Sequence, residues 1–144
     1  MSKSRIDYPR NYVLRITKEE WYRQVYTIKK YYPGVRRRWD PGGTILLVRK
    51  PEKTDSFIGY GIVGDFTKKD QLPEEKRQEC VKMGWRGEIA FKELYKFDPP
   101  LPIKDTALGG LGAKGKILQG YPLTNEQVQS VLDTAKGRVS FIKA

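Results

Sequence analysis

Residues 31–50, YYPGVRRRWDPGGTILLVRK, join a turn, three consecutive arginines and a tryptophan to an apolar run of strand length. Within them, residues 40–43 (DPGG) have the composition of a tight turn, and residues 44–49 (TILLVR) predict a buried strand. The next run of strand formers, FIGYGIVGDF at 57–66, follows after a polar loop that is too short for a helical crossover. The two strands are therefore expected to be antiparallel neighbours in the core of the fold.

Three further strand patterns and three helical patterns surround this pair. Strands are predicted at 12–16, at 88–97, where the DPP of residues 98–100 ends the run, and at 138–142. Helices are predicted from 18 to about 31, opened by a Thr17/Glu20 capping box, and at 71–83. A third helix follows the Thr124/Gln127 capping box and ends at Gly137. The glycines at 59, 61 and 64 suit a strand that bends. We expect an α+β fold of about five mixed, mainly antiparallel strands and about three helices, with a closed or nearly closed sheet, in one domain covering residues 1–144.

The charge balance predicts a polyanionic partner. The chain has 28 Lys and Arg against 17 Asp and Glu, which gives a formal net charge of +11. Such a charge attracts polyanions such as nucleic acid from a distance, but charge alone names no substrate. No run of about 18 apolar residues predicts a membrane span, and the basic N-terminal residues are not followed by the apolar stretch of a signal peptide. We expect a cytoplasmic protein with no membrane partner.

The absence of histidine removes the common catalytic arrangements. Without imidazole there is no Ser-His-Asp triad, no Cys-His pair and no histidine-bearing helix of the zinc metalloprotease kind. Because Cys80 is the one cysteine, an intrachain disulfide and a cysteine-based metal cluster are also excluded. A magnesium site needs clustered carboxylates, and those of this sequence are scattered. We therefore expect no metal, no cofactor and no assigned catalytic residue.

Residues that suit nucleic acid gather around the arginine run. Arginine pairs with phosphate, and aromatic rings stack on bases. The residues predicted to contact phosphates are Lys29, Lys30, Arg36, Arg37, Arg38, Lys114 and Lys116. Those predicted to stack on a base or line its pocket are Tyr32, Trp39, Tyr60 and Trp85. Some of them have a structural alternative: the arginines form a solvated turn, Trp39 fills one end of the barrel, Trp85 packs in the interior, and the glycines around Tyr60 serve only the curvature of the strand.

Residues 110–116, GLGAKGK, match the start of two nucleotide-binding patterns. Both matches fail in context, because Ile117 stands where the phosphate-loop pattern has Ser or Thr, and prolines occupy the approach in place of a buried strand. We interpret this segment as a flexible basic loop, from which Lys104, Lys114 and Lys116 can reach a phosphate backbone.

The strand and helix that lead to Trp21, the turn and strand WDPGGTILLVRK, and the glycine-rich strand FIGYGIVGDF together resemble the PUA-like superfamily, most closely its EVE-type and archaeal uncharacterised branches. The resemblance implies a pseudo-barrel that binds RNA, in some members through a flipped or modified base. Gly43 replaces the acidic residue usual in the turn, and no aromatic cage aligns residue by residue.

Two alternatives remain open at this point. The ASCH branch of the superfamily includes small amidohydrolases that act on acetylated cytidine through a lysine, a threonine and a glutamate, and no such set is evident near the arginines. A hydrolase acting on a modified nucleoside would need Asp65 or Glu88 as base, with Lys50 or Lys92 as partner. The second alternative is a protein-interaction domain whose charge keeps it in solution. The oligomeric state is not predicted.

Overall fold

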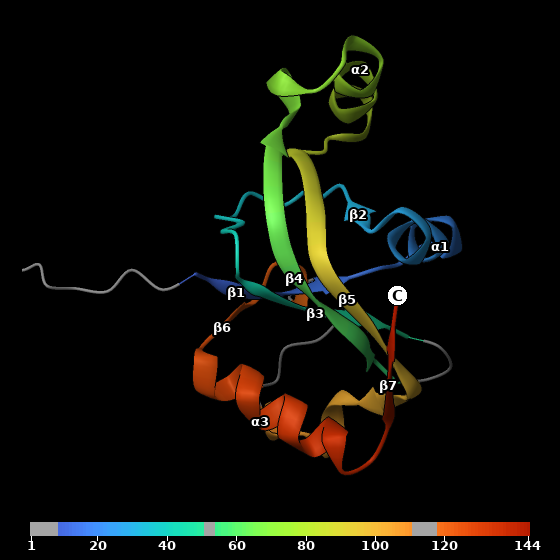
Figure 1. Cartoon of the computed structure of the whole chain (residues 1–144), viewed down its shortest axis with the longest axis vertical. Coiled ribbons are helices and arrows are strands. Elements are labelled where there is room, and N and C mark those ends of the chain that lie inside the picture. Colours follow the sequence, from blue (N-terminus) through green and yellow to red (C-terminus); the bar gives the residue numbers. More distant parts are fainter. Residues whose placement is uncertain (1–8, 51–53, 111–117) are drawn as a thin grey trace, which may run out of the picture.

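The computed structural model describes residues 9–50, 54–110 and 118–144, which form one mixed sheet with helices on both faces (Figure 1). The strands of the described residues are β1 (Asn11–Arg15), β2 (Lys30–Tyr31), β3 (Thr44–Arg49), β4 (Ser56–Lys68), β5 (Gly87–Pro102), β6 (Pro122–Leu123) and β7 (Ser140–Lys143). The helices are α1 (Glu19–Ile28), α2 (Glu74–Met83) and α3 (Asn125–Lys136), with short 3-10 turns at Lys69–Gln71, Ile103–Asp105 and Ala107–Gly110. The mixed α+β class is as predicted.

The strand order is β2-β5-β4-β3-β1-β6, with β7 also paired to β5. The predicted hairpin of β3 and β4 is antiparallel, with Leu46 opposite Tyr60. β1 is parallel to β3, and α1 lies between them in the chain. The sheet curves strongly but is not closed, because its end strands β2 and β6 do not pair with each other.

Each face of the sheet has its own hydrophobic core. On one face, Val25 of α1 packs with Leu14, Ile45 and Trp39. On the other, α3 packs Val131 and neighbouring residues against the alternate side chains of β1 and β3, among them Val13. The alternation of the apolar strands, one residue to each face, accounts for both clusters.

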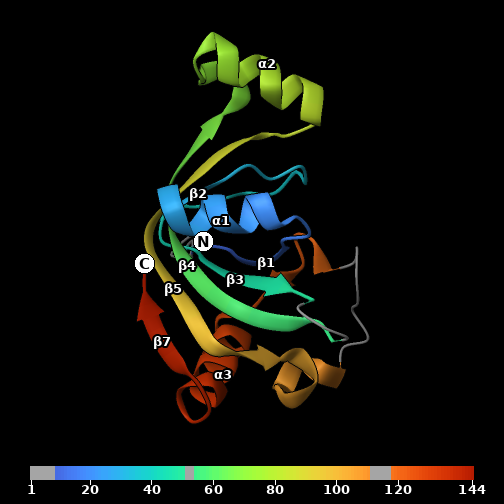
Figure 2. The same cartoon turned by 90° about the vertical axis from the view of Figure 1, so that its right-hand side faces the viewer.

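β4 and β5 continue beyond the body as a long two-stranded arm, and α2 lies at its tip (Figures 1 and 2). Figure 2 shows the arm curving so that α2 lies above α1 and the segment that follows β2. The arm is possible because β4 has 13 residues and β5 has 16, well beyond the usual strand length.

Several predicted boundaries were wrong. α1 starts at Glu19 with Lys18 as its N-cap and no side-chain cap bond, so the Thr17 capping box does not form. The helix ends at Ile28 rather than near residue 31, because Lys29 adopts a left-handed conformation (φ 58°) that turns the chain into β2.

Four other differences concern the arm and the sheet ends. α2 starts at Glu74 because the three residues before Leu72 form a 3-10 turn. β5 passes through Pro99 and Pro100, because its end pairs with the start of β4. β7 covers Ser140–Lys143, and the two-residue strands β2 and β6 were not predicted. The Thr124/Gln127 capping box at α3 is confirmed.

Within the described ranges, no helix is long and apolar enough to cross a membrane. The same residues contain no group of three or more carboxylates or cysteines that could hold a metal ion.

Candidate nucleic-acid interface

The three consecutive arginines lie on the segment 34–41, called here the arginine loop, which is anchored by Trp39. Trp39 is only 4% exposed and meets the Tyr12 ring edge-on, with 5.1 Å between ring centroids. Its ring belongs to the core on the α1 face, so it is not available for stacking on a base in this structure. The packing alternative, not the stacking role, describes Trp39.

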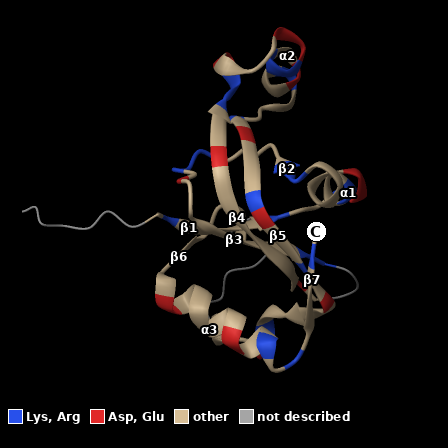
Figure 3. Ribbon diagram, in the orientation of Figure 1, with Lys and Arg blue, Asp and Glu red and all other residues tan. Residues whose placement is uncertain are grey.

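Arg36, Arg37 and Arg38 are all exposed, and two of them are held in place. Arg37 donates from Nε to the carbonyl oxygen of Gly120 at 2.8 Å and from Nη1 to that of Arg36 at 2.7 Å. Arg38 pairs through Nε with Asp40 Oδ1 at 2.8 Å. Figure 3 shows the loop as a basic projection beside the β4–β5 arm.

The hydrogen-bond partners of Arg37 do not neutralise its charge. Both are neutral carbonyls, and neither Arg36 nor Arg37 forms an ion pair with a carboxylate of the described residues. Among the described residues, no carboxylate compensates these two guanidinium charges, and Arg37 is already oriented. A guanidinium group has five N–H donors in a planar fork, so each retains donors for a phosphate.

The lysines predicted beside the loop differ in their surroundings. Lys29 is exposed at the end of α1. Lys30 is the first residue of β2, and its Nζ lies 3.2 Å from Glu88 Oε1. Only Lys29 of this pair is without a carboxylate partner among the described residues. Lys114 and Lys116 lie outside the described residues.

Tyr32 and Trp85 are brought together, but against each other. Their rings stack at 5.2 Å between centroids with 21° between planes, and Trp21 meets Trp85 edge-on at 6.1 Å. Tyr32 is 6% exposed, and its hydroxyl donates to Glu88 Oε2 at 2.8 Å. Burial and the neighbouring Glu88 carboxylate raise the pKa of Tyr32 above the usual tyrosine range. This ring cluster attaches the arm and α2 to α1, and Trp85 stays half-buried.

Tyr60 lies on the other face of the sheet. It stacks on Tyr95 at 5.0 Å between ring centroids and packs against the α3-face core, whereas Trp39 belongs to the α1-face core. The structure therefore does not bring Tyr60 and Trp39 to one pocket. The neighbouring glycines leave no cavity floor: a Cβ on Gly59 would lie 2.6 Å from the Tyr26 hydroxyl oxygen, and one on Gly61 would lie 2.5 Å from the Phe91 ring.

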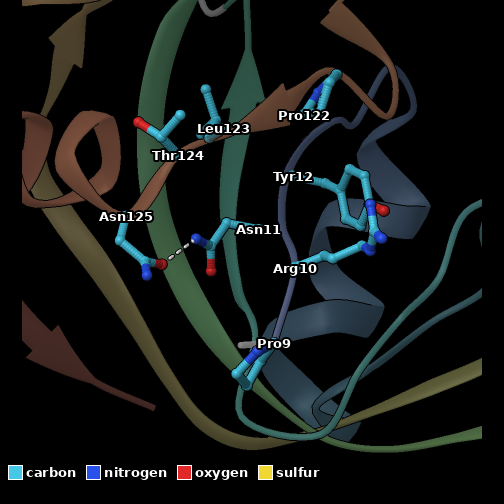
Figure 4. A pocket seen from close by; sticks show the side chains of 8 residues that line it. All are labelled: Pro9, Arg10, Asn11, Tyr12, Pro122, Leu123, Thr124 and Asn125. Atoms are coloured by element: carbon cyan, nitrogen blue, oxygen red, sulfur yellow. Dashed lines mark hydrogen bonds between the residues drawn. The ribbon is translucent and has the colours of Figure 1, made fainter. Parts of the chain in front are cut away.

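A shallow pocket of about 220 Å³ opens elsewhere, at the start of β1. It is lined by residues 9–12 and 122–125, and Figure 4 shows Asn11 and Asn125 on one side of β1 and the Tyr12 ring on the other. The pocket borders the arginine loop, because Asp40 accepts a hydrogen bond from the Arg10 backbone N–H at 2.9 Å. This pocket was not predicted. The available signal was Asn11, a buried polar residue at the head of an apolar strand.

The carboxylates considered for hydrolysis are placed differently from each other. Asp65 is exposed and accepts from the Phe66 backbone N–H, whereas the Glu88 side chain is 14% exposed between Lys30 and Tyr32. Lys50 and Lys92 are exposed, and in the described part of the chain neither forms an ion pair with these carboxylates. Of these two carboxylates, Glu88 is approached by a lysine, which is Lys30.

Comparison with solved structures identifies similar folds. The chain superposes on an ASCH protein from Zymomonas mobilis with a TM-score of 0.62 and 12% identity, covering 90% of this chain and 96% of that one. A hypothetical protein from Leishmania major gives a TM-score of 0.62 and 15% identity over the same shares. A serine-to-alanine variant of the Zymomonas protein matches with a TM-score of 0.61. No family model matches the sequence, and no curated protein matches it. At these identities the likeness concerns the fold alone.

Proposed function

We propose that this protein binds single-stranded nucleic acid, RNA in preference to DNA, and that the arginine loop contacts the phosphate backbone. The observation that carries the proposal is the geometry of the arginine loop. The buried Trp39 side chain anchors the loop to the core, and Arg36 and Arg37 project from it without carboxylate partners among the described residues. A prepositioned cluster of guanidinium groups loses little side-chain freedom on binding a polyanion.

The +11 charge and the fold support the same proposal. Charge of this size increases the association rate with polyanions, and the PUA-like fold is compatible with nucleic-acid binding. The function would then be of the kind that the resemblance to EVE-type and archaeal members implies, carried out by a single domain in the cytoplasm. Lys29, Lys114 and Lys116 complete the proposed phosphate contacts.

Fluorescence anisotropy with a labelled 12-nucleotide RNA tests this proposal directly. The variant Arg36→Ala/Arg37→Ala/Arg38→Ala should lower the affinity by about tenfold or more. The matched control is Lys96→Ala/Lys136→Ala/Lys143→Ala, which removes the same charge from exposed positions on β5, α3 and β7 and should have a much smaller effect. Thermal melts show whether each variant is folded. Equal losses in the two variants would mean that net charge alone, and not the loop, attracts RNA.

A second candidate is hydrolysis of a modified nucleoside, favoured by the Glu88 carboxylate. Its two oxygens are held by Lys30 Nζ at 3.2 Å and Tyr32 Oη at 2.8 Å, so a lysine and a carboxylate do converge. Such a carboxylate could act as a general base toward water. Incubation with N4-acetylcytidine, followed by chromatography of the product, tests it. The Glu88→Gln variant should abolish any turnover, and turnover that persists in this variant would exclude Glu88 as the base.

A further inference from the structure

The pocket at the start of β1 has a buried polar floor and an exposed rim. Asn11 and Tyr12 are 6% and 5% exposed, whereas Arg10 and Asn125 at the rim are open to solvent. β1 and β6 build the floor by pairing Asn11 with Leu123 and Tyr12 with Pro122. Its volume of about 220 Å³ is below the about 300–1,000 Å³ of pockets that enclose drug-sized ligands, so it suits a group of one or two fused rings.

Two side-chain amides face each other at this pocket, and their orientation is fixed (Figure 4). The Thr44 backbone N–H can only donate, and it donates to Asn11 Oδ1 at 2.9 Å. Asn11 must therefore present Nδ2 on its other side, where it donates to Asn125 Oδ1 at 2.7 Å. Asn125 is thus held with a known orientation by the interior of the protein.

This orientation leaves the Asn125 amide able to form further hydrogen bonds. No hydrogen bond among the described residues uses Asn125 Nδ2, which has two N–H donors, and Asn125 Oδ1 retains a second lone pair. A donor and an acceptor side by side on one asparagine amide complement the edge of a nucleobase, as in bidentate asparagine contacts to adenine. Leu123 and Pro9 provide apolar contacts beside these amides, whereas the Tyr12 ring packs on the opposite face of the sheet against Trp39.

The pocket also lies next to the arginine loop. Asp40 binds Arg38 through Oδ1 and the Arg10 backbone through Oδ2, so a single carboxylate connects the loop with the pocket rim. Close packing reinforces this connection, since a Cβ on Gly43 would lie 2.3 Å from the Arg10 carbonyl oxygen. A strand whose phosphates contact the arginines would therefore have a neighbouring base within reach of the pocket.

We propose that this pocket holds one unpaired nucleobase of the bound strand, with the Asn125 amide paired to the base edge and the arginine loop on the adjacent phosphates. The inference rests on the proposed RNA binding and adds the group that is recognised. It also differs from the sequence prediction, which assigned the base to Tyr32, Trp39, Tyr60 and Trp85.

Side-chain amide resonances give a direct test, because Asn11 and Asn125 are the only asparagines in the sequence. Adenosine, cytidine, guanosine and uridine are titrated separately into ¹⁵N-labelled protein, with ribose 5-phosphate as a probe that lacks a base. At least one nucleoside should shift the Asn125 Nδ2 signals saturably, and ribose 5-phosphate should not. Equal shifts with ribose 5-phosphate would show a phosphate site, and no shift with any nucleoside would also overturn the proposal.

A second experiment separates this inference from the proposed function. The full chain is titrated with a 12-nucleotide RNA and with the same backbone carrying abasic sites. The RNA should bind at least about fivefold more tightly. Asn125→Ala should remove this preference, whereas Gln129→Ala, which alters an exposed amide paired to Asp133 on the same helix, should keep it. Equal binding of both strands would overturn the base pocket and leave RNA binding intact. Failure of both strands to bind would overturn the proposed function and the inference together.

Discussion

At the scale of single residues, Trp39 was predicted to stack on a base, but the structure shows it packed in the core. Its neighbours are arginines, and an exposed ring beside arginines is typical of a stacking platform. The structure places the ring in the core against Tyr12 and leaves the arginines outside. A side chain at the base of a loop can thus determine where the loop lies without contacting a ligand.

Trp39→Ala should lower the free energy of unfolding by about 3–5 kcal/mol, because it leaves a large cavity in the core. Trp39→Phe should cost less, since much of the apolar ring is retained. Urea denaturation followed by circular dichroism measures both. A loss of less than 1 kcal/mol in Trp39→Ala would contradict the buried position.

The buried tyrosines predict a loss of stability at high pH. Burial raises the pKa of Tyr26 and Tyr32 above the usual tyrosine value of about 10, and the Glu88 carboxylate adds to the shift at Tyr32. Above about pH 10 the unfolded chain loses these protons while the folded chain keeps them, so the free energy of unfolding falls as the pH rises. The decrease should approach about 1.4 kcal/mol per pH unit for each tyrosine.

Urea midpoints at pH 8, 9.5, 10.5 and 11 provide the measurement. Because lysines also titrate in this range, the informative quantity is the difference from Tyr26→Phe/Tyr32→Phe, whose stability should depend less on pH. Identical pH profiles for the two proteins would contradict the account.

Single residues also show where prediction from sequence stops. Burial of Trp39, the Lys30–Glu88 pair and the stack of Tyr32 on Trp85 all join segments distant in the chain. Charge and aromaticity are local and could be read from the sequence, whereas these partners depend on how the sheet folds.

At the scale of elements, the two predicted capping boxes form a natural comparison. Thr124 accepts from the Gln127 backbone N–H at 3.1 Å, and Gln127 Oε1 accepts from the Thr124 N–H at 2.8 Å. At α1 the same sequence pattern fails, because Lys18 and not Thr17 occupies the N-cap position. The pattern therefore predicts that a helix begins nearby but not which residue caps it.

Thr124→Ala should reduce the free energy of unfolding by about 1 kcal/mol. Thr17→Ala should change it by less than about 0.5 kcal/mol, as expected for an exposed position without a special role. Chemical denaturation of the two variants side by side tests this. Equal losses would mean that Thr17 caps α1 after all.

The arm provides a second prediction for an element. α2 has a thin apolar face, and Trp85, which follows it, stacks on Tyr32 beside α1. Trp85→Ala should loosen α2 from the body more than it affects the central strands. Hydrogen exchange should then increase in residues 74–83 while β3 stays protected. Unchanged exchange in α2 would show that the stack does not hold it.

At the scale of the whole molecule, the sequence was sufficient for the class of fold. The apolar run of β3, the short loop that follows it and the glycine-rich β4 predicted the central hairpin, which is confirmed. The sequence could not show that β1 is parallel to β3, or that β4 and β5 extend into an arm, because both depend on long-range pairing. Exposure of the arginines could be predicted from three consecutive charges, while the pocket beside them depends on residues 9–12 meeting residues 122–125.

The central claim is that the arginine loop neutralises phosphates of a single strand, and the salt dependence of RNA binding tests it most directly. Affinity is measured from 50 to 200 mM salt for the native protein, the arginine triple variant and the lysine control. The logarithm of the affinity should fall less steeply with the logarithm of salt in the arginine variant, by a slope of about 2 for three lost contacts to a single strand. The lysine control should retain the native slope. Equal slopes for the native protein and the arginine variant would contradict the claim.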